Sequence, residues 1–173
     1  MPLDTTPLKP GLEGSTEVLV GTRDTAPHIG SGKIKVLATP VMVMMMEEAA
    51  LNAVEGLLPE GHQTVGTRLD ITHTAATPVG MRVIATAELV EVDGRKLTFR
   101  VSAKDEKEPI SEGIHERIIV NVARFEHPTE AALPDPAEGQ RRHRGEGQHR
   151  VDRGHPAAHP AGQVHRPGRG AAE

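Results

Sequence analysis

The residues of this chain that could carry out acid–base chemistry are Thr39, Glu47 and His73. Glu47 directly follows six consecutive apolar residues, and a helical wheel places it on an apolar helix face, together with Val43, Met44, Leu51 and Val54. A carboxylate on such a face needs a partner, because burying an unpaired charge is costly. Glu47 is therefore either a reactive group or an ordinary acid at the edge of the core that reaches solvent or the backbone.

The candidate histidine lies in a segment whose residues alternate between apolar and polar. Residues 62–75 predict a strand in which His73 shares a face with Leu69 and Ile71. We therefore expect His73 to point toward the core and toward the helix that carries Glu47. A histidine on an apolar strand face is more often a satisfied core residue than a functional one, although its near-neutral pKa suits proton transfer.

The element that must position Glu47 is a long helix beginning at Thr39. We expect Thr39 to supply an N-cap oxygen and Pro40 to take the first helical position. No glycine interrupts the helix before Gly56, and we expect it to end near Leu58. Because its apolar run is far shorter than the roughly 20 residues of a membrane span, the sequence predicts a helix buried on all sides within a protein core.

The other predicted elements are strands joined by short turns. Asp93-Gly94 between two alternating runs is a strong hairpin signal. An antiparallel sheet with one central helix is an α+β arrangement, and a sheet curled around the helix would bury it on every side. The expected strands span residues 15–20, 62–75, 82–92, 96–104 and 110–125.

Composition narrows the class of protein. The net charge of −4 argues against a nucleic-acid partner, and the absence of cysteine excludes disulfides, thiolate metal sites and a cysteine nucleophile. The first residues lack the features of a secretory signal, so we expect a cytoplasmic protein with no membrane partner. From about Ala137 the chain contains no Leu, Ile, Met or Phe. We therefore expect an extended segment over 1–14, one domain over 15–128 and a disordered Pro/Gly/Arg/His-rich tail over 129–173.

Five short motifs stand out within residues 15–126: Leu37-Ala38-Thr39-Pro40, Met46-Glu47, Val65-Gly66-Thr67, Thr72-His73-Thr74-Ala75-Ala76-Thr77-Pro78 and His115-Glu116-Arg117. Together they resemble the fluoroacetyl-CoA thioesterase family of hotdog-fold proteins. The resemblance implies a catalytic set of Thr39, Glu47 and His73, with Gly66 and Arg117 near the bound acyl group. It also implies an acyl-CoA substrate, no metal and no cofactor apart from the coenzyme A of the substrate, and a homodimer, or a tetramer of paired dimers, with active sites at the subunit interface.

These residue types suit thioester hydrolysis. Glu47 could attack the acyl carbon or act as a base on water, and spacing does not separate the two roles. His73 could move protons or polarise the thioester, and Thr39 could orient Glu47 or help to hold the oxyanion. The plain alternatives are a helix cap for Thr39 and an ion pair with Glu116 or another surface acid for Arg117.

Two differences from the fluoroacetyl-CoA enzyme bear on substrate choice. Residues 29–36 form a short segment without an aromatic residue, where that enzyme has a longer, Phe-containing lid, and Glu48 stands where it has an aromatic residue. An ordinary small acyl-CoA is therefore the expected substrate. The phosphates of coenzyme A would need cations on the rim, and the candidates are Arg82, Arg95 and Lys96.

Two other functions are compatible with a hotdog domain, since a fold does not fix a function. One is a non-catalytic module that binds CoA esters, and the other is a hydratase. Glu47 and His73 at the family spacing favour catalysis over binding alone. The usual Asp-x-x-x-x-His pattern of the hydratases is absent, because no histidine lies between Thr39 and Leu58.

Overall fold

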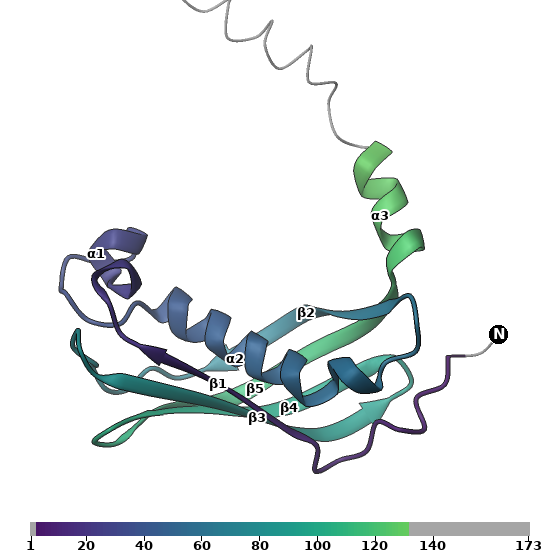
Figure 1. Cartoon of the computed structure of the whole chain (residues 1–173), viewed down its shortest axis with the longest axis horizontal. Helices are drawn as coiled ribbons and strands as arrows, with labels where there is room; N and C mark the ends of the chain where they lie inside the picture. Colours follow the sequence, from purple (N-terminus) through teal and green to yellow (C-terminus); the bar gives the residue numbers. More distant parts are fainter. Residues whose placement is uncertain (1–2, 132–173) are drawn as a thin grey trace, which may run out of the picture. The chain divides into compact units, whose positions relative to one another are not determined.

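The computed structural model describes residues 3–131, and the side chains as far as residue 126. Its centre is a five-stranded antiparallel sheet that curls around helix α2 (Thr39–Val54), as Figure 1 shows. The strand order is β1-β3-β4-β5-β2. The α+β prediction is confirmed. The strands are β1 (Glu13–Leu19), β2 (His62–Ile71), β3 (Arg82–Asp93), β4 (Lys96–Asp105) and β5 (Pro109–Asn121).

Helix α2 forms where the sequence predicts it, but its first turn differs. Ala38 is the N-cap, Thr39 is already helical, and no side chain caps the helix. The hydroxyl of Thr39 is therefore free for another partner, and the predicted cap is wrong. A short 3-10 turn, η2 (Glu55–Leu57), follows the helix and ends next to Leu58.

Burial of α2 is one-sided in the described chain. The face that packs on the sheet is fully buried, and the central sulfur-containing side chains Met42, Met45 and Met46 are shielded from solvent. The opposite face is open, because Met44 is 55% exposed. The prediction of a helix buried on all sides is therefore wrong for a single copy of the chain.

Strands β2 and β5 lie side by side and carry the polar side chains of interest. Their register pairs Gly66 with Arg117, and a bulge follows between Gly66 and Arg68. Alternation along β5 turns His115, Arg117 and Ile119 into the buried layer under α2. The sheet thus places a buried cation directly across from a glycine.

Several predicted boundaries shift. Strand β2 ends at Ile71, although the Thr72 and Thr74 amides still donate to β5 carbonyls. Strand β5 ends at Asn121 rather than at Phe125, because the chain there turns into helix α3 (Val122–Ala131). The predicted tail overlaps this helix only at 129–131 and otherwise lies outside the described residues.

At the other end, β1 starts at Glu13, two residues earlier than predicted. The segment before it is anchored by Leu8, which is buried. Two short helical turns, η1 (Thr22–Asp24) and α1 (Ala26–Ile29), lie between β1 and α2. The predicted hairpin is confirmed: Asp93 pairs with Lys96, and Gly94 takes a φ of +57°, a conformation that favours glycine.

Candidate functional site

Two of the three predicted catalytic residues meet at the start of α2. The Thr39 hydroxyl lies 2.8 Å from Nδ1 of His73 in a hydrogen bond. The bond joins the first residue of the helix to the segment that follows β2. Both side chains border an open hollow of about 360 Å³, whose other walls include Val36 and Ala75. A small acyl group could therefore reach the pair from solvent.

His73 has a free ring nitrogen. Its Nε2 is shielded from solvent and has no hydrogen-bond partner among the described residues. Burial lowers the pKa of His73 below the usual 6.5, against a smaller opposing effect of the Ala75 backbone. The lowered pKa favours the neutral ring at neutral pH, in which one nitrogen carries a proton and the other a lone pair.

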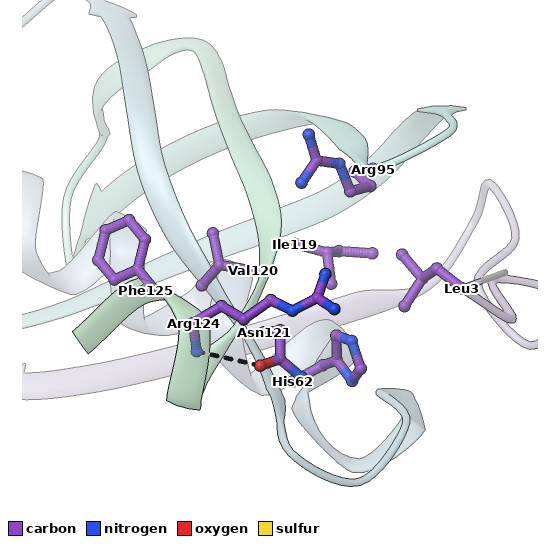
Figure 2. A pocket seen from close by; sticks show the side chains of 8 residues that line it. All are labelled: Leu3, His62, Arg95, Ile119, Val120, Asn121, Arg124 and Phe125. Carbon is purple, nitrogen blue, oxygen red and sulfur yellow. Dashed lines mark hydrogen bonds between the residues drawn. The ribbon is translucent and has the colours of Figure 1, made fainter. Parts of the chain in front are cut away.

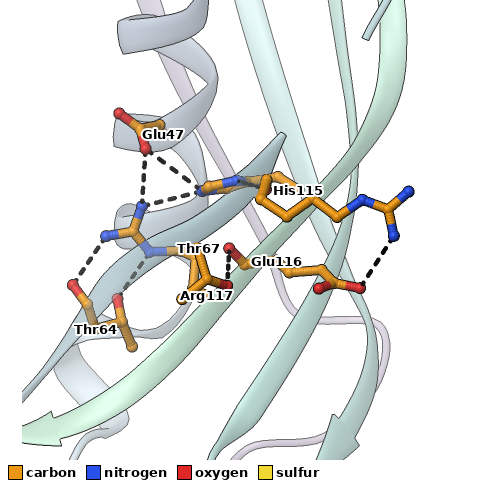
Figure 3. A network of polar contacts seen from close by, with 7 residues as sticks. Glu47, Thr64, Thr67, His115, Glu116 and Arg117 are labelled. Atoms are coloured by element: carbon orange, nitrogen blue, oxygen red, sulfur yellow. Dashed lines mark hydrogen bonds and ion pairs between the residues drawn. The ribbon is translucent and has the colours of Figure 1, made fainter. Parts of the chain in front are cut away.

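Glu47 lies two turns further along α2, on its open face. Its side chain is 44% exposed, and its Oε1 lies 3.9 Å from both Nη1 of Arg117 and Nε2 of His115 (Figure 3). The carboxylate sits over Gly66 of β2, where an added Cβ would approach Oε1 to 2.5 Å. Any larger residue at position 66 would displace the carboxylate from this place.

Arg117 is a buried cation held on several sides. Its side chain is 5% exposed, its Nε donates to the Thr64 hydroxyl at 2.9 Å, and its Nη2 donates to the Thr64 carbonyl at 2.9 Å. Burial lowers the pKa of Arg117 and the nearby Glu47 carboxylate raises it. The guanidinium stays charged, since arginine does not lose its proton in proteins. A fixed positive charge thus lies beneath the open carboxylate.

The five predicted site residues fall into two groups. One is the Thr39–His73 pair, and the other is Glu47 with Gly66 and Arg117. Glu47 lies eight positions after Thr39 in the helix, which is about 12 Å along the axis. Thr39 therefore does not orient Glu47 within one chain.

The alternative ion pair of Arg117 with Glu116 is wrong. Glu116 points to the other face of the sheet, where it lies 3.9 Å from Arg68 and 3.7 Å from Lys96. Sequence reasoning also missed His115 and Thr64 as members of the site. The two-residue period of β5 would have placed His115 on the same face as Arg117, but the register that brings Thr64 beneath the guanidinium needs the structure.

The rim cations differ in their partners. Arg82 pairs with Glu17, and Lys96 lies near Glu116. Arg95 has no acidic partner among the described residues, and it lines a pocket of about 290 Å³ with Arg124 and His62 (Figure 2). Of the three predicted candidates for the phosphates of coenzyme A, Arg95 is thus the one without an ion pair to a described side chain.

Two further kinds of feature are absent from the part of the chain that the structure describes. No group of three or more His, Asp or Glu side chains there could hold a metal ion. No helix in that part of the chain is long and apolar enough to span a membrane.

Comparison with known proteins places the chain among thioesterases. The sequence profile of the family described as "Fluoroacetyl-CoA-specific thioesterase" matches residues 20–123. The fluoroacetyl-CoA thioesterase of Streptantibioticus cattleyicolor is 45% identical over 91 residues, which are 53% of this chain and 66% of that protein.

Solved structures agree with the sequence match. A variant of fluoroacetyl-CoA thioesterase in complex with acetyl-CoA superposes with a TM-score of 0.69 at 34% identity, over 73% of this chain and all of that one. A hot-dog-like protein from Thermanaerovibrio acidaminovorans superposes with a TM-score of 0.66 at 22% identity, over 73% of this chain and 93% of that one, and shows the fold alone. The hotdog prediction is confirmed.

Proposed function

Because the chain belongs to the fluoroacetyl-CoA-specific thioesterase family, we propose that it hydrolyses a small acyl-CoA thioester to the free acid and coenzyme A. One observation carries the proposal: Glu47 is a half-exposed carboxylate that rests on Gly66 above the buried charge of Arg117. A relative in complex with acetyl-CoA supports a small acyl group.

Two routes from Glu47 lead to the same products. In the first, the carboxylate attacks the acyl carbon, the carbon–sulfur bond breaks, and coenzyme A leaves as a thiolate that takes up a proton; water then hydrolyses the mixed anhydride. In the second, Glu47 takes a proton from a water molecule that attacks the acyl carbon directly. In both routes the Arg117 charge stabilises negative charge beside the reacting atoms.

In this proposal the Thr39–His73 pair either protonates the leaving thiolate or donates a hydrogen bond to the carbonyl oxygen of the thioester. The neutral ring of His73 would exchange a proton with a bound group that reaches the shielded Nε2, and the Thr39 hydroxyl fixes the ring through Nδ1. The backbone amide of Thr39 adds a donor for a developing oxyanion, whereas Pro40 has no N–H and the Val41 and Met42 amides donate to the Ala38 carbonyl.

The proposed enzyme is a homodimer whose active sites lie between the copies. The support is the separation within one chain, about 12 Å along α2, between Thr39 and Glu47. Further support is the open face of α2, where Met44 is exposed one turn from Glu47. A second copy that covers this face would bring its own Thr39–His73 pair to the Glu47 of the first copy. Pairing of dimers into a tetramer remains a prediction.

Hybrid dimers test this arrangement. A dimer of one Glu47→Gln copy and one His73→Ala copy retains one intact site if the two residues of a site come from different copies. It retains none if they come from the same copy. We expect about half of the wild-type activity per dimer. Inactive hybrids would show that each site is built from a single chain.

The substrate proposed is an ordinary short acyl-CoA rather than fluoroacetyl-CoA alone. The support is the segment 29–36, which offers the hollow no aromatic side chain and leaves Ile34 exposed. Arg95 and Arg124 are proposed to hold the coenzyme A phosphates, and no other cofactor is expected. A cytoplasmic location remains a prediction.

The test of the function is thiol release from a panel of short acyl-CoAs. We expect hydrolysis by the wild-type protein and none by Glu47→Gln or His73→Ala. Glu55→Gln is the matched control, because Glu55 is an exposed carboxylate that follows directly on the end of α2. Binding of CoA esters without thiol release would favour a binding module, and hydration without free thiol would favour a hydratase.

A further inference from the structure

We propose that His115 is a positioning residue, which as a neutral imidazole accepts a hydrogen bond from Arg117 and thereby aims the guanidinium at Glu47. The proposal rests on the thioesterase function proposed above. His115 is distinct from His73, lies 1% exposed in the middle of β5, and does not reach the open hollow.

Hydrogen bonding fixes the tautomer of His115. Its Nδ1 lies 2.8 Å from the carbonyl oxygen of Arg68, and a carbonyl can only accept, so Nδ1 carries the proton. Its Nε2 lies 3.1 Å from Nη1 of Arg117, and a guanidinium can only donate, so Nε2 carries the lone pair. One partner at each nitrogen thus selects the neutral ring with hydrogen on Nδ1.

The surroundings of the ring keep it neutral. Burial lowers the pKa of His115, the Arg68 carbonyl and the Glu47 carboxylate raise it, and the charge of Arg117 lowers it further. On β4, the only ring packed nearby is Phe99, with the ring centres 6.3 Å apart. A proton on Nε2 would point a donor at the Arg117 donor and break the contact.

The lone pair of His115 accepts the third of the hydrogen bonds that hold the Arg117 guanidinium. Thr64 holds one edge of the guanidinium through its hydroxyl and its carbonyl, and His115 holds Nη1. Nη1 is also the nitrogen that lies 3.9 Å from Oε1 of Glu47, as Figure 3 shows. Without His115, only Thr64 would hold the guanidinium, and the planar group could turn about the edge that Thr64 binds. Such a turn would move Nη1 away from the Glu47 carboxylate.

Two substitutions separate positioning from mere structural support. His115→Gln offers an amide oxygen near the place of Nε2 and loses the donor to the Arg68 carbonyl. His115→Asn offers an amide nitrogen near the place of Nδ1, keeps that donor, and loses the acceptor for Arg117. We expect kcat of the Asn variant to fall about tenfold or more with little change of KM, and kcat of the Gln variant to stay within about threefold of wild type. A structural role predicts the reverse order.

A second pair of variants acts on the other side of the guanidinium. Thr64→Val removes the hydroxyl acceptor without changing shape, and Thr64→Ser keeps it. If either His115 variant fails to fold, the proposal requires a lower kcat for Val than for Ser at equal melting temperature. Equal kcat values for these two variants, or for the two His115 variants, would overturn it.

A measurement that needs no substrate can test the role of His115 separately from the proposed thioesterase activity. Nitrogen NMR of the His115 ring in the wild-type protein should show hydrogen on Nδ1 and a hydrogen-bonded lone pair on Nε2 at neutral pH. The opposite tautomer or a doubly protonated ring would refute the positioning role even in an active enzyme. Wild-type protein that releases no thiol from any acyl-CoA would refute the proposed function while leaving the NMR result to stand by itself.

Discussion

The replacement Gly66→Ala tests the proposed role of Glu47 without touching the carboxylate chemically. A Cβ at this position would lie 2.5 Å from Oε1 of Glu47 and 3.2 Å from Cε1 of His115. Ordinary contact begins at 3.4 Å, so the carboxylate must retreat by about 0.9 Å. It can do so easily, because it is the end of a flexible side chain that is half exposed.

The expected result is loss of rate without loss of fold. A misplacement of about 1 Å in a reacting group can cost about 100-fold in rate, or about 2.7 kcal/mol of transition-state stabilisation. We expect kcat to fall by about this factor, and the melting temperature to change little. Thiol-release kinetics and thermal unfolding on the same preparations measure both quantities.

Two other glycines give matched controls. A Cβ at Gly56 meets nothing within 4 Å, so Gly56→Ala should leave the rate unchanged and should not lower stability. A Cβ at Gly14 would lie 2.5 Å from the backbone nitrogen of Ala53 in α2, and still closer to the carbonyl oxygen of Ala49. Since backbone atoms cannot move aside cheaply, Gly14→Ala should lose stability first. If Gly66→Ala keeps the wild-type kcat while folded, Glu47 is not the group that reacts.

Four further outcomes follow from the geometry. Thr39→Val should lower kcat about tenfold at unchanged melting temperature, because the hydroxyl binds His73 and caps nothing, and Thr39→Ser should restore it. The acid limb of kcat/KM, which reports the free enzyme, should have its midpoint below pH 6.5, since the pKa of His73 is lowered and the neutral ring persists as pH falls; a midpoint above 6.5 would contradict this. Arg95→Ala with Arg124→Ala should raise KM for acyl-CoA but not for an acyl thioester of N-acetylcysteamine, which lacks the phosphates. Asp105→Ala should cost about 1–2 kcal/mol of unfolding free energy near neutral pH with kcat intact, because the carboxylate accepts three hydrogen bonds at the β4–β5 turn.

The stabilisation by the Asp105 carboxylate should depend on pH. Burial raises the pKa of this carboxyl, but the hydrogen bonds from Lys107, Glu108 and Thr77 outweigh it, and the net pKa lies below the usual 3.8. The stabilisation is therefore complete above pH 3.8 and is lost as pH falls through the lower, folded-state pKa. The difference in unfolding free energy between wild type and variant should shrink only in strong acid.

Much of the fold follows from local patterns in the sequence. Alternation located β3 and β4, and Gly94 marked the turn between them because the turn needs a positive φ. The apolar run after Pro40 located α2. The predicted end of β5 is wrong, because apolar residues continue past Asn121 although the chain there turns into α3.

Much less of the site could be predicted from the residues alone. Apolar periodicity identified Glu47 as a carboxylate on a buried helix face. In one chain that face, which Glu47 shares with Met44, is open instead. The interaction of Thr39 with His73 depends on a contact between residues 34 positions apart, which no local rule supplies. The grip of Thr64 on Arg117 likewise depends on the register of β2 against β5.

The geometry also changes what the three predicted catalytic residues mean as a set. Along the sequence they look like one group, because Thr39 and Glu47 are close in number and His73 follows on the next strand. In the fold, α2 sets Thr39 and Glu47 about 12 Å apart, and His73 stays with Thr39. Glu47 instead faces the buried pair of Arg117 and His115. The helix thus separates the two predicted halves of the site and is open on the face that carries Glu47. The proposed homodimer would close this face, because a second copy of the chain carries its own Thr39–His73 pair.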